Sequence, residues 1–140
     1  MNPTLEGDID VVEVHSGDDD GLLWLSLGFV SEHDPLDVLH IACGQQATGD
    51  AACDALYLER TDQDLACSGE VRALRIGAMA IELALSPAGA QALALSERIR
   101  FNFHAQPALH AQAAAQLARM AAAGQACIVD SDDKENADGH

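Results

Sequence analysis

The sequence predicts an α+β fold, with an antiparallel sheet of about six strands and a short helix and a long C-terminal helix packed on one face. Most segments with strand-like alternation precede the longer helical segment, and this grouping favours an antiparallel sheet over a doubly wound parallel one. A Ser-Pro pair marks the start of the short helix, and a narrow apolar stripe marks the long one. The 140 residues are enough to bury a core without a metal or a disulfide.

The first three strands are expected between residues 9 and 43. Ile9–Val14 and Leu22–Val30 are predicted to form a hairpin, because the turn-forming cluster Gly17–Gly21 separates them. Val38–Cys43 is the next apolar run and the third predicted strand. The polar, irregular residues 44–54 that follow are interpreted as a loop.

Three further strands are expected in the middle of the chain. Leu56–Leu58 alternates with polar neighbours, and the polar segment Arg60–Asp64 separates it from the apolar run Val71–Ile76. Ala80–Leu85 follows as another strand, and Gly77 marks the connection between the last two.

A short helix and the most regular strand come next. Ser86 supplies a capping hydroxyl and Pro87 a preformed first turn for a helix over residues 88–95. In Glu97–His104 the apolar and polar residues alternate, which is typical of a sheet with one wet or partner-facing side. The core face of this strand carries Ile99, Phe101 and Phe103, and the other face carries Arg98, Arg100, Asn102 and His104.

The last helix is expected from Pro107 to Gly124. Its apolar stripe, which should face the sheet, consists of Leu109, Ala113, Leu117 and Met120. Residues 130–140 are acidic and nearly devoid of apolar side chains, so they are predicted to be a disordered tail. Residues 1–129 are therefore expected to form a single domain.

The charge is large and uneven. The formal net charge is −16, and residues 1–64 carry 15 acidic residues against one arginine. Such a field repels nucleic-acid backbones and anionic lipid surfaces, so neither is expected as a partner. It suits the steering of a basic protein, although the simplest explanation of surface charge is solubility.

The chain lacks the metal-ligand, serine-nucleophile and phosphate-binding motifs of common enzymatic sites. Its four cysteines and six histidines lack metal-ligand spacing, and the sequence contains no GxSxG, GxGxxG or GxxxxGK motif. The run Asp18–Asp20 lacks the spacing of a calcium loop. We therefore expect no catalytic residue, no metal and no cofactor. The start of the chain lacks the features of a secretory signal, which predicts a cytoplasmic protein with free thiols.

A resemblance narrows the function. The segment Asp54–Ala123, about half of the chain, resembles the immunity protein 10 family of bacterial polymorphic-toxin systems. The residues that carry this resemblance are Leu56–Arg60 with Asp62–Gln63, Ser68–Val71, Ile81–Leu83, Ser86–Pro87 and Ile99–Phe103. The chain departs from the family at Glu70, where the family tends to have a second glycine.

The resemblance implies a cytosolic immunity protein that binds and neutralises a cognate secreted toxin. The uneven charge predicts that it binds through an acidic surface, and we expect a monomer or weak homodimer without enzymatic activity. The expected toxin contacts are Asp50, Asp54, Glu59, Asp62, Gln63 and Glu70. Two alternatives stay open. One is a small-ligand-binding protein or enzyme with a pocket between sheet and helix, which would need a perturbed group near Tyr57, Arg100 or His104. The other is a structural subunit that self-assembles through a strand edge.

Overall fold

A single mixed sheet organises the chain. The computed structural model describes residues 5–30, 37–44, 56–60, 65–104, 106–125 and 127–130. From one edge to the other, the strand order is β5-β4-β3-β2-β1-β8-β7-β6-β9. The strands are β1 (Leu5–Asp19), β2 (Leu22–Phe29), β3 (Asp37–Gly44), β4 (Tyr57–Arg60), β5 (Ala66–Ser68), β6 (Val71–Ile76), β7 (Ala80–Leu85), β8 (Leu95–Asn102) and β9 (Ile128–Asp130). The helices are α2 (Pro87–Leu93) and α3 (Pro107–Ala122).

The α+β class and the two helices agree with the sequence prediction, but the sheet does not. It has nine described strands instead of about six, and the pairs β1/β8 and β6/β9 are parallel. Both parallel pairs join segments that are far apart in the sequence, so local alternation gives no sign of them. The strands β5 and β9, which were not predicted, have three residues each and are too short to show a period.

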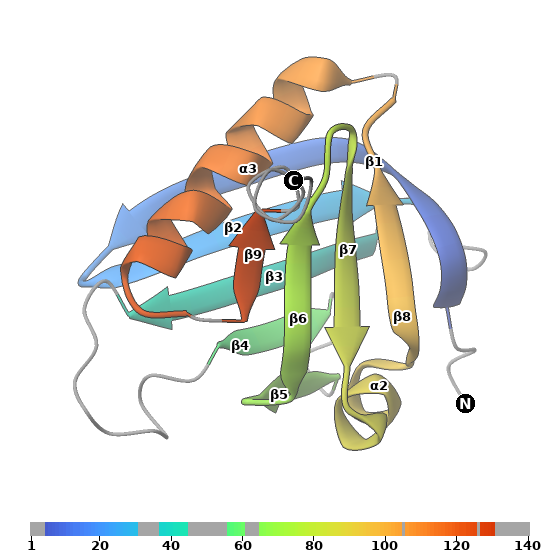
Figure 1. Cartoon of the computed structure of the whole chain (residues 1–140). Coiled ribbons are helices and arrows are strands. Elements are labelled where there is room, and N and C mark those ends of the chain that lie inside the picture. Colours follow the sequence, from blue (N-terminus) through green and yellow to red (C-terminus); the bar gives the residue numbers. More distant parts are fainter. Residues whose placement is uncertain are drawn as a thin grey trace, which may run out of the picture.

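The long strand β1 divides the sheet into two halves. Its first part pairs with β8 and its second part with β2, and the register shifts between Val11 and Glu13. Such an irregularity bends a strand and increases its twist. Figure 1 shows β1 curving from the half that contains β6–β8 to the half that contains β2–β4, whose strands cross those of the first half. The inner faces of both halves contribute to one core.

Aromatic and aliphatic side chains fill this core as the alternation predicted. Ile99, Phe101 and Phe103 are all buried, and the ring of Phe101 lies 5.7 Å from the ring of Phe29 on β2. Asn102 was expected on the wet side of its strand, but it is buried, and its Oδ1 accepts a hydrogen bond from Arg100 Nε at 3.1 Å.

The first hairpin closes through a shorter turn than predicted. β1 continues to Asp19, and only Asp20 and Gly21, with φ values of 51° and 83°, form the connection. Two consecutive residues with positive φ give the turn type whose twist matches paired strands, and an Asp-Gly pair tolerates it. Gly17 therefore lies within the strand, opposite Trp24.

Both helices begin at the predicted prolines. Ser86 Oγ accepts a hydrogen bond from the backbone N–H of Gly89 at 3.0 Å and caps α2. α3 lies across β1 and β2 and also contacts β9 (Figure 1). Its side chains Ala113, Leu117 and Met120 are buried, which confirms the core-facing stripe, while Leu109 is half-buried. Most of the predicted loop, residues 45–54, and most of the predicted tail, residues 131–140, lie outside the described residues.

Candidate protein-binding face

The outer face of β1–β5 presents two rows of laterally paired residues. The first row consists of Gly17, Trp24, Ala42, Tyr57 and Ser68. The second consists of His15, Ser26, His40, Glu59 and Ala66. We call these ten residues the Trp24–Tyr57 face. Their neighbours along each strand point the other way, and those on β2, β3 and β4 are buried.

The described helices lie on the opposite side of this half-sheet. Ser16 and Asp18, which point inward, contact α3 through Gln112 at 3.3 Å and through Arg119 at 2.8 Å. The inward-pointing Arg60 contacts the end of α2. Within the part of the chain that the structure describes, the Trp24–Tyr57 face therefore carries no helix.

Two aromatic rings stand among small side chains on this face. Tyr57 is 39% exposed, and the half-buried Trp24 packs over Gly17, where an added Cβ would lie only 2.9 Å from the indole ring. Leu22, two residues before Trp24, is 49% exposed and extends the apolar surface. Tryptophan and tyrosine are enriched among the residues that dominate binding energy at protein interfaces. Tyr57, Trp24 and Leu22 therefore make this face a candidate contact surface.

The polar side chains on this face are one carboxylate, Glu59, and serine, tyrosine and histidine side chains. Tyr57 Oη donates a hydrogen bond to Glu59 Oε1 at 2.5 Å, and this bond raises the pKa of the Tyr57 hydroxyl. Beside the second row, Glu13 Oε1 lies 3.4 Å from His15 Nε2. Neither row contains lysine or arginine. A basic partner surface would complement this arrangement.

One group of residues on the face has the serine, histidine and carboxylate sequence of a catalytic triad. Ser26 Oγ and His40 Nδ1 are 2.6 Å apart, and Glu59 is the lateral neighbour of His40. A serine nucleophile also needs N–H donors for the oxyanion that forms. Ser26 lies on β2, which is paired on both sides by β1 and β3, and it is only 7% exposed. We interpret the contact as a hydrogen bond through which the buried Ser26 orients the His40 side chain on this face.

The predicted toxin contacts fall in different places. Glu59 belongs to the Trp24–Tyr57 face, whereas Glu70 is tied to the start of α2. Glu70 Oε1 accepts a hydrogen bond from Ser86 Oγ at 2.5 Å, and the Glu70 carbonyl oxygen accepts one from the Ser86 N–H at 2.9 Å. Holding the capping serine is thus a structural task that the sequence did not reveal. The remaining predicted contacts lie outside the described residues: Asp50, Asp54, Asp62 and Gln63.

Arg60 was predicted to begin a polar connection, but it is a buried structural residue. It is 7% exposed, and its Nη2 pairs with Oδ2 of Asp37, which is 3% exposed. Arg60 Nη1 also donates hydrogen bonds to the carbonyl oxygens of Leu93 at 3.0 Å and Ala94 at 3.1 Å. This one side chain thus joins β3, β4 and the end of α2.

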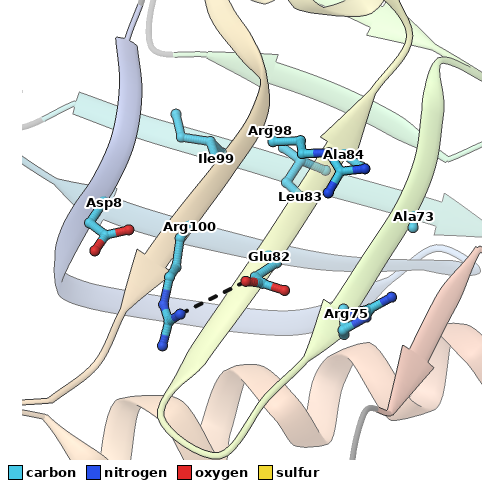
Figure 2. Close-up of a pocket in the computed structure, with 9 residues that line it drawn as sticks. All are labelled: Asp8, Ala73, Arg75, Glu82, Leu83, Ala84, Arg98, Ile99 and Arg100. Atoms are coloured by element: carbon cyan, nitrogen blue, oxygen red, sulfur yellow. Dashed lines mark ion pairs between the residues drawn. The ribbon is translucent and has the colours of Figure 1, made fainter. Parts of the chain in front are cut away.

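A second candidate site lies on the outer face of the other half-sheet. A hollow of about 390 Å³ opens above Ala73 and Ala84, and its rim carries Arg75, Arg98 and Arg100. Asp8 and Glu82 also line it. Figure 2 shows these side chains, with Asp8 on β1 at one end and Arg75 on β6 at the other. This hollow lies on the outer face of the sheet, and not between sheet and helix, where the alternative hypothesis placed a pocket.

The described residues show no metal or thiol chemistry. They contain no group of three or more His, Cys, Asp or Glu side chains able to hold a metal ion. Burial raises the pKa of Cys43 to about 11 and raises the pKa values of Cys67 and Cys127. These three free thiols are therefore protonated near neutral pH and are weak nucleophiles. In the described part of the chain, neither helix has the length and hydrophobicity needed to span a membrane.

No family model, curated protein or solved structure matches this chain. The resemblance to the immunity protein 10 family stays a prediction. The geometry of the two outer faces is consequently the basis for assigning a function.

Proposed function

We propose that the protein is a cytoplasmic immunity protein that binds and neutralises a cognate bacterial toxin, and that the Trp24–Tyr57 face makes the contact. The observation that supports this proposal most is that the exposed Tyr57 and the half-buried Trp24 lie with the Glu59 carboxylate on a sheet face without lysine or arginine, which no described helix covers. The protein acts by occupying its partner's surface and not by catalysis.

The physical mechanism combines steering with aromatic anchoring. The net charge of −16 attracts a basic toxin from a distance and accelerates association. After contact, Trp24 and Tyr57 supply apolar area, and the Glu59 carboxylate, held by the Tyr57 hydroxyl, pairs with a lysine or arginine of the toxin. Nucleases and other enzymes that handle anions need such cations for their own substrates, so this contact blocks them.

Self-assembly through a strand edge has less support. The edge strands β5 and β9 contain three residues each and offer few unpaired backbone groups. Short edges are one of the ways in which proteins avoid edge-to-edge pairing. The proposal therefore keeps the protein a monomer or a weak homodimer.

Replacing Tyr57 with alanine tests the face. The change should weaken binding to the toxin encoded by the adjacent gene by about 30-fold or more, because an anchoring aromatic contributes about 2 kcal/mol or more. Binding would be measured by surface plasmon resonance, with protection of toxin-expressing cells as a second readout. Tyr57→Phe keeps the aromatic ring, and its affinity for the toxin should fall much less than that of Tyr57→Ala. Unchanged affinity in Tyr57→Ala would exclude this face from the interface.

Electrostatic steering makes a separate prediction for Glu59. Glu59→Gln should slow association, whereas Glu97→Gln, the same charge change at an exposed site on β8, should alter it by less than about twofold. Raising the ionic strength from about 0.05 to 0.5 M should slow association of the parent protein as well. Equal association rates at both salt concentrations would contradict electrostatic steering.

A further inference from the structure

The positive charge of this acidic protein is concentrated on one outer face. Only seven residues are basic, and four of them lie on β6 and β8: Arg72, Arg75, Arg98 and Arg100. Arg60 is buried in its ion pair, and Arg119 pairs with Asp18 at 2.8 Å. The face of β6–β8 therefore has the opposite charge character from the Trp24–Tyr57 face.

Part of this face is a cross-strand charge ladder. Arg75, Glu82, Arg100 and Asp8 are lateral neighbours across β6, β7, β8 and β1. Arg100 Nη1 lies 3.9 Å from Glu82 Oε2, drawn as the dashed line in Figure 2. Alternating charges of this kind stabilise sheets modestly. A ladder accounts for Arg100 and Glu82 without any ligand.

Arg98 has no place in that ladder. Its lateral neighbours are Ala84 and, beyond it, Ala73, whose small side chains leave the floor of the hollow open. Among the described residues, neither Arg98 nor Arg75 forms an ion pair. Two guanidinium groups that form no ion pair with a described residue thus border this hollow, in a protein whose net charge is −16.

We infer that this hollow binds an oxyanion group, a phosphate or a carboxylate, through Arg98 and Arg75 with Arg100 beside them. The planar guanidinium group matches the geometry of both anions and can bind them with two parallel hydrogen bonds. Two carboxylates, Asp8 and Glu82, line the same hollow and oppose the anion, which favours a seat nearest Ala84 and Arg98. At physiological salt, screening over about 8 Å lets the local arginines outweigh the distant acidic residues.

The anion has two possible sources with the same chemistry. One is a free phosphate or carboxylate compound. The other is the acidic segment that follows β9, the strand beside β6, because residues 131–140 contain four acidic side chains. Both sources present oxyanions to the same guanidinium groups. They differ in one respect: if the acidic segment binds in the hollow, it competes with an added anion.

Titration with inorganic phosphate and with succinate, followed by NMR of the arginine Nε–H signals, tests the site. In the parent protein the signals of Arg75 and Arg98 should shift in a saturable way. Arg98→Gln should weaken binding by about tenfold or more, because hydrogen bonds to charged groups are the strong ones. The matched control is Arg72→Gln, an exposed arginine of β6 that does not line the hollow, and it should change the affinity by less than about twofold.

A second variant separates a shaped site from diffuse charge. Ala84→Leu should fill the hollow and weaken anion binding without changing the charge or removing a strand-forming residue. If Ala84→Leu binds as the parent does, or if Arg72→Gln weakens binding as much as Arg98→Gln, the inference is wrong and only non-specific attraction exists.

Neutralising the acidic segment in the full-length chain identifies the source of the anion. If the segment occupies the hollow, the neutralised chain should bind phosphate more tightly, and if free compounds are the ligands, its affinity should match that of the parent. In both cases the dependence on Arg98 must persist, and its loss would overturn the site. The four substitutions are Asp132→Asn, Asp133→Asn, Glu135→Gln and Asp138→Asn.

Discussion

Replacing Phe101 with alanine is expected to lower the free energy of unfolding by about 3–5 kcal/mol. The side chain is 1% exposed and lies on β8, which pairs with β1, the strand that joins the two halves of the sheet. Its ring contacts Phe29 of β2, a strand that is separated from β8 by β1 in the sheet order. The substitution would therefore remove contacts between the two halves of the sheet as well as contacts within one half.

Urea unfolding followed by circular dichroism would measure this loss. Phe101→Leu keeps most of the apolar volume and should cost less than Phe101→Ala. Val30→Ala, at a residue that is 58% exposed, should change stability by no more than about 0.5 kcal/mol. A near-neutral Phe101→Ala would place this side chain on the surface and reverse the assigned faces of β8.

The sequence predicted the elements whose own residues carry the signal. The strands β2, β3 and β6–β8 show their alternation or apolar runs locally, and Ser86 and Pro87 mark the start of α2 by capping chemistry. β5 and β9 contain too few residues to be distinguished from loops. The parallel pairing of β1 with β8 depends on which remote segments meet, and no local period contains that information.

The sequence predicted the acidic character of the candidate site but not which residues share its face. An excess of carboxylates predicted an acidic contact surface, and of the predicted contacts Glu59 lies on the Trp24–Tyr57 face. Trp24 and Tyr57 were not among the predicted contacts, because their position on one face follows from the register of four lateral pairings. Strand parity was the available signal, since Trp24 alternates with the buried Leu23 and Leu25.

Charged residues were the hardest to assign from sequence. Arg60 and Glu70 look like surface charges, yet one is buried and the other holds the cap of α2. Their partners, Asp37, Leu93 and Ser86, are 16 or more residues away. Only the fold brings these groups together. Counting charges in the sequence therefore placed Arg60 in a polar connection and Glu70 in the partner interface, although both make contacts within the protein.

Replacing Arg60 with leucine is the second large effect, with an expected loss of about 3–5 kcal/mol. The substitution removes the positive charge beside the buried Asp37 carboxylate and the donors to the carbonyl oxygens of Leu93 and Ala94. Those carbonyl groups end α2, where Ala94 adopts a left-handed conformation with φ of 53° before β8 begins. The destabilisation should therefore affect the α2–β8 junction first, which hydrogen exchange would detect as faster exchange there.

A double-mutant cycle shows whether the cost arises from the loss of the ion pair between Asp37 and Arg60. Asp37→Leu combined with Arg60→Leu removes both charges, so it should be less destabilising than the sum of the two single changes. Arg60→Lys retains the charge but not the planar, forked donors of the guanidinium group. Its stability should lie between those of the parent and Arg60→Leu, because one ammonium group does not match the geometry in which Arg60 donates to three acceptors. If the two single losses simply add, Asp37 and Arg60 act independently, and the buried ion pair is not what joins β3, β4 and α2.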